Sequence, residues 1–206
     1  MPVVLVANPK GGVGKTTLAT NIAGYFASRG RAAMLGDVDR QQSARLWLSL
    51  RSPQAREIRS WETTDDGAVA RPPRGTTHAV LDTPAGLHGA RFKEVVAVAD
   101  KVLVPLQPSI FDIYATRDFL DKLLANRHAG KTKIALVGMR VDARTLAADR
   151  LREFVAGLDV PVLGELRDTQ NYVQLAARGL TLFDIAPGRV QRDLEQWEPI
   201  RQWLDA

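Results

Sequence analysis

The chain has 206 residues, of which 45% are apolar, and this is enough for one domain over residues 1–206 with a sizeable core. It contains no cysteine, which excludes disulfides, thiolate metal sites and iron–sulfur clusters. No apolar run approaches the roughly 20 residues of a membrane span, and no signal peptide precedes the first apolar run, so we expect a cytoplasmic protein. The net charge of +5 permits a polyanionic partner but does not require one.

Apolar strand-like runs alternate along the chain with segments of helical spacing. This alternation predicts an α/β fold with a mostly parallel, twisted sheet and helices on both faces. The predicted strands span residues 3–7, 32–37, 78–82, 101–106, 133–139 and 161–164. The predicted helices span residues 15–29, 41–50, 87–98, 110–127, 144–157, 169–178 and 189–204. Turn signals between residues 63 and 77 predict a loop there.

The first predicted strand runs into the sequence NPKGGVGKTT at residues 8–17. Gly14, Lys15 and Thr16 fit the end of the phosphate-loop pattern G-x-x-x-x-G-K-[ST], while Pro9 stands where its first glycine belongs. A second lysine, Lys10, lies five positions before the usual one. The order of strand, glycine-rich loop and helix is the context that this motif needs, whereas a plain glycine-rich turn with an exposed lysine would leave the threonine unexplained.

The glycines of this loop let successive backbone N–H groups turn inward toward phosphate oxygens. The following helix presents its N-terminus to the same anion. Lys15 then reaches the outer phosphates, and the Thr16 hydroxyl is placed to bind Mg²⁺.

Carboxylates follow the next two predicted strands. Asp37 and Asp39 come after the second, and Asp82 ends the third. Asp82 is placed to hold Mg²⁺ beside a phosphate loop, usually through a coordinated water, although a lone strand-terminal aspartate is more often only a cap or turn residue.

Three runs together carry a family resemblance: KGGVGKTT, the Asp-x-Asp after strand two, and Leu-Asp-Thr-Pro-Ala-Gly over residues 81–86. They resemble the ParA/MinD group of P-loop ATPases, whose phosphate loop carries an extra signature lysine. Further matches extend the resemblance over nearly the whole chain, at residues 104–109 with Asp112, 139–145 and 166–187. The chain is similar to the short ParA type, because the first strand leaves no room for a preceding helix-turn-helix extension.

The resemblance implies that Lys15 contacts the β- and γ-phosphates, with Thr16 on Mg²⁺ and Thr17 at the α-phosphate. Lys10 would cross the interface of an ATP-bound dimer to the partner's phosphates, and Gly11 would permit the close approach of the two loops. Gly12, Val13 and Gly14 complete the predicted nucleotide-binding loop.

The resemblance also implies that Asp39 positions the attacking water and that Asp37 lies near the Mg²⁺ shell. Lys10, Lys15 and Asp39 are thus the candidate catalytic residues, and Thr16, Asp37 and Asp82 the candidate metal residues. Where the family commonly has Asp-Pro-Gln, this chain has Arg40 in place of proline, either as a solvated loop residue or as a further contact.

Positions after late strands suggest Arg140 and Arg167 beside the adenine, although either could be an ordinary surface arginine. DNA binding without sequence preference is implied by the resemblance, and five arginines are its candidates: Arg144, Arg150, Arg152, Arg167 and Arg178. A further group of arginines is expected to solvate a face: Arg45, Arg51, Arg56, Arg59, Arg71 and Arg74.

The last predicted helix carries an apolar stripe with a charge-balanced polar face: its stripe is Val190, Leu194, Trp197, Ile200 and Leu204. A membrane-binding helix of the MinD type would carry a cationic face, so we expect this helix to pack on the sheet.

These observations predict an ATP-dependent dimerising ATPase with Mg²⁺, slow and partner-stimulated, that positions a plasmid, a chromosome or a protein assembly on the nucleoid. Its expected partners are a second copy, a ParB-like or cargo-adaptor protein and double-stranded DNA. The alternative is a MinD-like membrane-associated positioning ATPase. A metal-cluster carrier of the same superfamily would need cysteines, and a DNA-binding protein without enzyme activity would leave the phosphate loop unexplained.

Overall fold

The computed structural model describes residues 1–39, 41–61, 74–126 and 131–206. Within these ranges seven strands form one sheet in the order β3-β2-β4-β1-β5-β6-β7, and every pairing is parallel. The strands are β1 Val3–Val6, β2 Ala33–Asp37, β3 Ile58–Trp61, β4 His78–Asp82, β5 Lys101–Leu106, β6 Lys133–Met139 and β7 Val162–Leu166. The α-helices are α1 Lys15–Ser28, α2 Ser43–Ser49, α3 Gly89–Ala97, α4 Ile110–Asn126, α5 Leu146–Ala156, α6 Gln170–Ala176 and α7 Gln191–Asp205.

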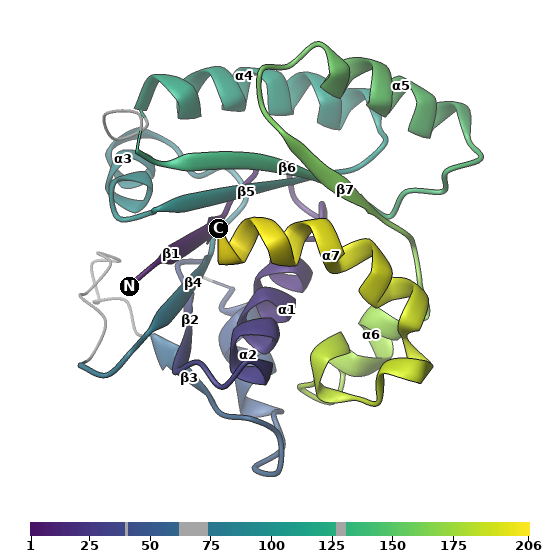
Figure 1. Ribbon diagram of the computed structural model, residues 1–206. Helices are drawn as coiled ribbons and strands as arrows, with labels where there is room; N and C mark the ends of the chain where they lie inside the picture. The colour runs from purple at the N-terminus through teal and green to yellow at the C-terminus, as the bar shows by residue number, and fades with distance from the viewer. Residues whose placement is uncertain (40, 62–73, 127–130) are drawn as a thin grey trace.

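The predicted doubly covered sheet is confirmed, and the strand β1 shows why it forms. All four of its side chains are buried, with Val3 and Leu5 in one core cluster and Val4 and Val6 in the other. Because successive side chains of a strand point to opposite faces, such a run needs cover on both sides. Helices α3, α4 and α5 supply it on one face, and α1, α2, α6 and α7 on the other (Figure 1).

The packing of the last helix also agrees with expectation. Trp197 and Ile200 are fully buried and Leu204 is 3% exposed, all within the cluster that covers β1 on the α1 side. The apolar stripe of α7 is therefore occupied by the core. In the part of the chain that the structure describes, no helix has both the length and the apolar character needed to cross a membrane.

The strand β3 was not predicted. Ile58 and Trp61 are buried while Arg59 and Ser60 between them are exposed, so the segment lacks the alternation that marks a strand. It pairs with β2 at the edge of the sheet. Two short 3₁₀ helices were not predicted either: Leu182–Asp184 lies in a region without a prediction, and Pro187–Arg189 ends at the first residue of the helix predicted over 189–204. The predicted loop over residues 63–77 lies mostly outside the described residues, as does Arg40.

The sheet brings the sequence motifs together at the carboxyl ends of its strands. Strand β4 lies between β1 and β2, so that Val6 pairs with Asp82 and Asp82 pairs with Asp37. The loop after β1 and the aspartates that end β2 and β4 consequently share the carboxyl end of the sheet, where open α/β sheets bind ligands.

Candidate functional site

The phosphate loop has the backbone that its glycines predict. Gly12 and Gly14 adopt left-handed conformations, with φ of 75° and 93°. A Cβ on Gly14 would lie 2.8 Å from the Met139 Cε atom, the end of a flexible side chain that can shift, so it is the left-handed backbone that requires glycine at this position. Helix α1 begins directly after it, at Lys15.

Hydrogen bonds from neighbouring segments brace the loop. The Asn8 side chain accepts from the Lys10 N–H at 2.9 Å, and its amide donates to the Pro105 carbonyl of β5 and to the Thr116 hydroxyl of α4. The Gln107 amide donates to the Gly12 carbonyl at 2.9 Å. The Gly86 N–H donates to the Pro9 carbonyl at 2.9 Å. The loop is thus held as a cradle by the carboxyl ends of β4 and β5 and by α4.

Lys15 reaches back across this cradle. Its ammonium donates to the Lys10 carbonyl at 2.7 Å, and the residue is only 8% exposed. Burial lowers the pKa of Lys15, while the nearby charges of Asp82 and Asp39 oppose that shift. A buried ammonium with so few partners is placed to gain from an incoming anion.

Asp82 lies beneath the loop with one oxygen satisfied and one not. Its Oδ2 accepts from the Thr16 hydroxyl at 2.6 Å, whereas its Oδ1 is buried without a hydrogen-bond partner among the described residues. Burial raises the pKa of Asp82 to about 7, against the Thr16 hydrogen bond that lowers it. An orphaned carboxylate oxygen beside a threonine hydroxyl fits a Mg²⁺ site, because this cation takes oxygen ligands.

Asp37 has a different environment from the one expected of a metal residue. Its Oδ1 accepts from the Asp39 N–H at 2.9 Å, and its Oδ2 accepts from the N–H groups of Ala44 and Arg45 at 2.8 and 3.3 Å. Burial raises the pKa of Asp37, and these hydrogen bonds oppose the shift. The residue ties the end of β2 to the first turn of α2, and its place near Mg²⁺ stays a prediction.

Two cavities meet at the loop. One of about 440 Å³ opens above it and is lined by Gly11, Gly12, Gly14, Lys15, Thr16, Thr17, Asp39, Gln41, Ser43, Thr83, Pro84, Ala85 and Arg140. The other, of about 240 Å³, shares Gly14, Thr17 and Arg140 with the first and continues to Arg167 and Tyr172. Gln41 and Ser43 were not predicted as site residues. Gln41 ends the run that corresponds to the family's Asp-Pro-Gln, which could have marked it, whereas Ser43 lies in none of the motifs.

The remaining predicted residues differ in their relation to these cavities. Val13 is 1% exposed as a whole residue and lines neither cavity, so its contact with a nucleotide stays a prediction. The Lys10 ammonium lies 4.0 Å from Asp112, and its side chain is 41% exposed, away from the cavity lining. Arg167 lines the smaller cavity, but its Nε donates to the buried Asp193 at 2.5 Å. Arg140 sits at the seam with a left-handed φ of 53°.

The arginines divide by their partners. Arg51 forms a bidentate pair with Asp184, 2.7 Å at its shortest, with side chains 5% and 7% exposed, so the prediction that it solvates a surface is wrong. Three of the DNA candidates also form ion pairs: Arg144, Arg152 and Arg167. Arg150 and Arg178 have no ion-pair partner among the described residues. Arg71 lies outside those residues.

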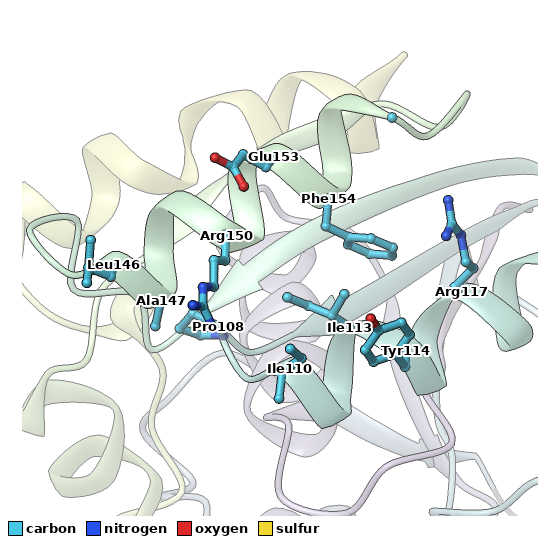
Figure 2. A pocket seen from close by; sticks show the side chains of 11 residues that line it. Pro108, Ile110, Ile113, Tyr114, Arg117, Leu146, Ala147, Arg150, Glu153 and Phe154 are labelled. Carbon is cyan, nitrogen blue, oxygen red and sulfur yellow. The ribbon is translucent and has the colours of Figure 1, made fainter.

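A larger cavity, of about 770 Å³, lies between α4 and α5, and no residue of the phosphate loop lines it. Figure 2 shows Phe154 of α5 and Ile113 and Tyr114 of α4 facing the same space, with Arg117 and Arg150 beside it. It is separate from the site built by the motifs.

The family model of the CobQ/CobB/MinD/ParA nucleotide binding domain (CbiA) matches residues 4–182. The chain belongs to this family. It is 29% identical over 197 residues to maintenance of carboxysome distribution protein A of Halothiobacillus neapolitanus, covering 91% of this chain and 90% of that one. It is 28% identical over 181 residues to the chromosome-partitioning ATPase Soj of Thermus thermophilus, covering 72% and 73%.

Solved structures show that the fold is shared as well. The structure of a variant of McdA from Cyanothece in complex with ATP superposes with a TM-score of 0.68 at 15% identity, covering 97% of this chain and 96% of that one. Membership of this nucleotide-binding family accounts for the phosphate loop, for the two neighbouring strands that end in aspartates, and for the parallel sheet with helices on both faces.

Proposed function

We propose that this member of the CobQ/CobB/MinD/ParA family is an ATP-dependent dimerisation switch that hydrolyses ATP slowly and positions cargo on the nucleoid. The observation that carries the proposal is the pair of incompletely compensated charges at the loop. Lys15 has only a backbone carbonyl to bond, and Asp82 has a buried oxygen with no partner among the described residues. Nucleotide phosphates and Mg²⁺ would satisfy both.

The two cavities fit the two ends of a nucleotide. Phosphates would lie in the larger one against the N-terminus of α1, with Lys15 exchanging the Lys10 carbonyl for phosphate oxygens. Thr17 lies at the seam, where the α-phosphate would sit. The base would enter the smaller cavity beside Arg140 and Arg167.

Mg²⁺ would be held by Thr16 and Asp82 together with phosphate oxygens, where it would neutralise charge on the transferred group. Asp39 lines the phosphate cavity and would orient the attacking water. Its Oδ1 accepts from the Gln41 N–H at 3.0 Å, so one of its oxygens is already engaged. An engaged carboxylate is consistent with slow turnover that a partner protein accelerates.

Lys10 supports the dimerisation part of the proposal. Its ammonium lies outside the cavity of its own chain, partly exposed beside Asp112. From there it would reach the phosphates of a second copy. A Cβ added to Gly11 would meet only the Ala85 Cβ, at 4.0 Å, so the backbone there leaves room for the partner loop. ATP would then be the ligand that joins the two chains.

We infer the kind of cargo from the relatives and the binding of DNA from the charge of the chain. One relative is named for carboxysome distribution and another for chromosome partitioning. A net charge of +5, with Arg150 and Arg178 free of ion pairs among the described residues, would favour the phosphate backbone of DNA. The protein would be cytoplasmic and nucleoid-associated, with a ParB-like or other adaptor. A MinD-like membrane role is disfavoured because the apolar stripe of α7 is buried.

Phosphate release and DNA-shift assays test the proposal. We expect slow Mg²⁺-dependent ATP hydrolysis, and salt-sensitive binding to arbitrary duplex DNA with ATP but not ADP. Lys15→Ala should lose both activities. Asp39→Ala should lose hydrolysis and keep ATP-dependent DNA binding. A wild-type chain that neither hydrolyses ATP nor responds to it would overturn the proposal.

A further inference from the structure

Arg91 joins two segments that the sequence motifs treat separately. It lies in the first turn of α3, which follows the Asp82 loop, and its Nη2 donates to the Val38 carbonyl at 2.8 Å. Val38 lies between Asp37 and Asp39, 53 residues earlier in the chain than Arg91. The contact therefore links the helix after β4 to the turn after β2.

Val38 is also held through its N–H, which donates to the Asp82 carbonyl at 3.0 Å. The next N–H, that of Asp39, donates to the Asp37 carboxylate at 2.9 Å. Within the described part of the chain, Arg91 is the side chain that reaches from α3 to the carbonyl directly before Asp39.

The placement of Arg91 is not what helix stability favours. A cation in the first turn opposes the helix dipole, and that turn of α3 has no acidic residue to offset it. The Nε atom of Arg91 is moreover buried without a hydrogen-bond partner among the described residues. A buried unsatisfied donor is costly, so it needs an explanation beyond packing.

We propose that Arg91 is a positioning residue for hydrolysis: it sets the direction of the Asp39 side chain by fixing the Val38 carbonyl against the Asp82 strand. This inference rests on the proposed function, in which Asp39 orients the attacking water. Arg91 lines neither the phosphate cavity nor the loop, so it acts through the peptide and not on the nucleotide. A small misplacement of a water-orienting carboxylate is enough to slow a reaction by about 100-fold.

The test compares Arg91→Met and Arg91→Lys with Lys93→Met, which removes an exposed cation two residues along the same helix. Initial rates of phosphate release from Mg²⁺-ATP give kcat and KM separately. We expect Arg91→Met to lower kcat by about 10- to 100-fold with KM for ATP within about 2-fold of wild type. Arg91→Lys should recover part of kcat, and Lys93→Met should match wild type.

A double variant separates positioning from folding. If Arg91 acts through Asp39, Arg91→Met should add no further loss to the slow residual phosphate release of an Asp39→Ala chain, followed as a single turnover with enzyme in excess over ATP. The inference fails if Arg91→Met turns over like Lys93→Met, if its loss in kcat comes with an equal rise in KM, or if the two losses multiply. A wild-type chain without ATPase activity overturns the proposed function itself, which is a different result from an active wild type and an unaffected variant.

Discussion

Asp82→Asn should stabilise the protein in the absence of nucleotide and Mg²⁺, and by an amount that depends on pH. Asp82 is 1% exposed, one of its oxygens has no partner among the described residues, and burial raises its pKa from 3.8 to about 7. That difference corresponds to a cost of about 4 kcal/mol when the carboxylate is ionised in the folded state. Asparagine keeps the shape without the charge.

The pH dependence follows from the direction of the shift. A folded-state pKa above the unfolded one means that the folded protein binds the extra proton between about pH 4 and pH 7. Stability is therefore lost as pH rises through that window, and the full cost is present above it. Between pH 5 and pH 8 the wild type should lose about 3 kcal/mol relative to the asparagine variant.

Urea denaturation at pH 5 and pH 8 measures this difference. For a domain of this size 1 kcal/mol corresponds to roughly 2–4 °C in Tm, so thermal melts would also resolve it. Asp121→Asn, at an exposed position on α4, is the control and should give the same small difference at both pH values. An advantage of Asp82→Asn that does not change with pH would refute the reasoning.

Four further substitutions test packing outside the candidate site by urea denaturation. Arg51→Met leaves the buried Asp184 without its bidentate partner and should lower the free energy of unfolding by about 3–5 kcal/mol. Gly179→Ala, at φ 63° with the new Cβ 2.4 Å from the Arg51 backbone nitrogen, should cost about 2 kcal/mol or more, whereas Gly30→Ala, at φ 72° in open space, should cost only about 1–2 kcal/mol of backbone strain. Trp197→Ala empties a fully buried position and should cost about 3–5 kcal/mol.

A matched exposed pair gives the scale for the first of these. Arg59 lies 3.2 Å from Glu57 with side chains 57% and 72% exposed, so Arg59→Met should change stability by less than about 1 kcal/mol. Equal effects of Arg51→Met and Arg59→Met would contradict the structural role of the buried pair. Equal effects of the two glycine substitutions would contradict the close approach at Gly179.

Most of the fold could be predicted because its strands are buried on both faces. A continuous apolar run such as that of β1 is visible without knowledge of its partners. The edge strand β3 escaped prediction because only Ile58 and Trp61 are buried in it, and two exposed residues between them break the strand period. Which side chains of an edge strand are buried depends on the segments that pack on that strand, and the local sequence does not indicate them.

The site divides in the same way. The residues of the phosphate loop and Asp82 lie in recognisable motifs, and the structure brings them together at the carboxyl end of the sheet. The Asn8 brace to α4 and the Arg91 contact with Val38 join positions 108 and 53 residues apart. Such contacts follow from how helices pack on the sheet, so no spacing rule indicates them.

The central claim is that ATP joins two copies of the chain through Lys10, and light scattering coupled to size-exclusion chromatography tests it most directly. With Mg²⁺-ATP the Asp39→Ala variant, in which hydrolysis should be blocked, is expected to double its molar mass from the 22.6 kDa of one chain, and with ADP it should not. Adding Lys10→Ala should keep ATP binding and abolish the doubling. A chain that stays monomeric with ATP, or that dimerises equally well without Lys10, would contradict the account.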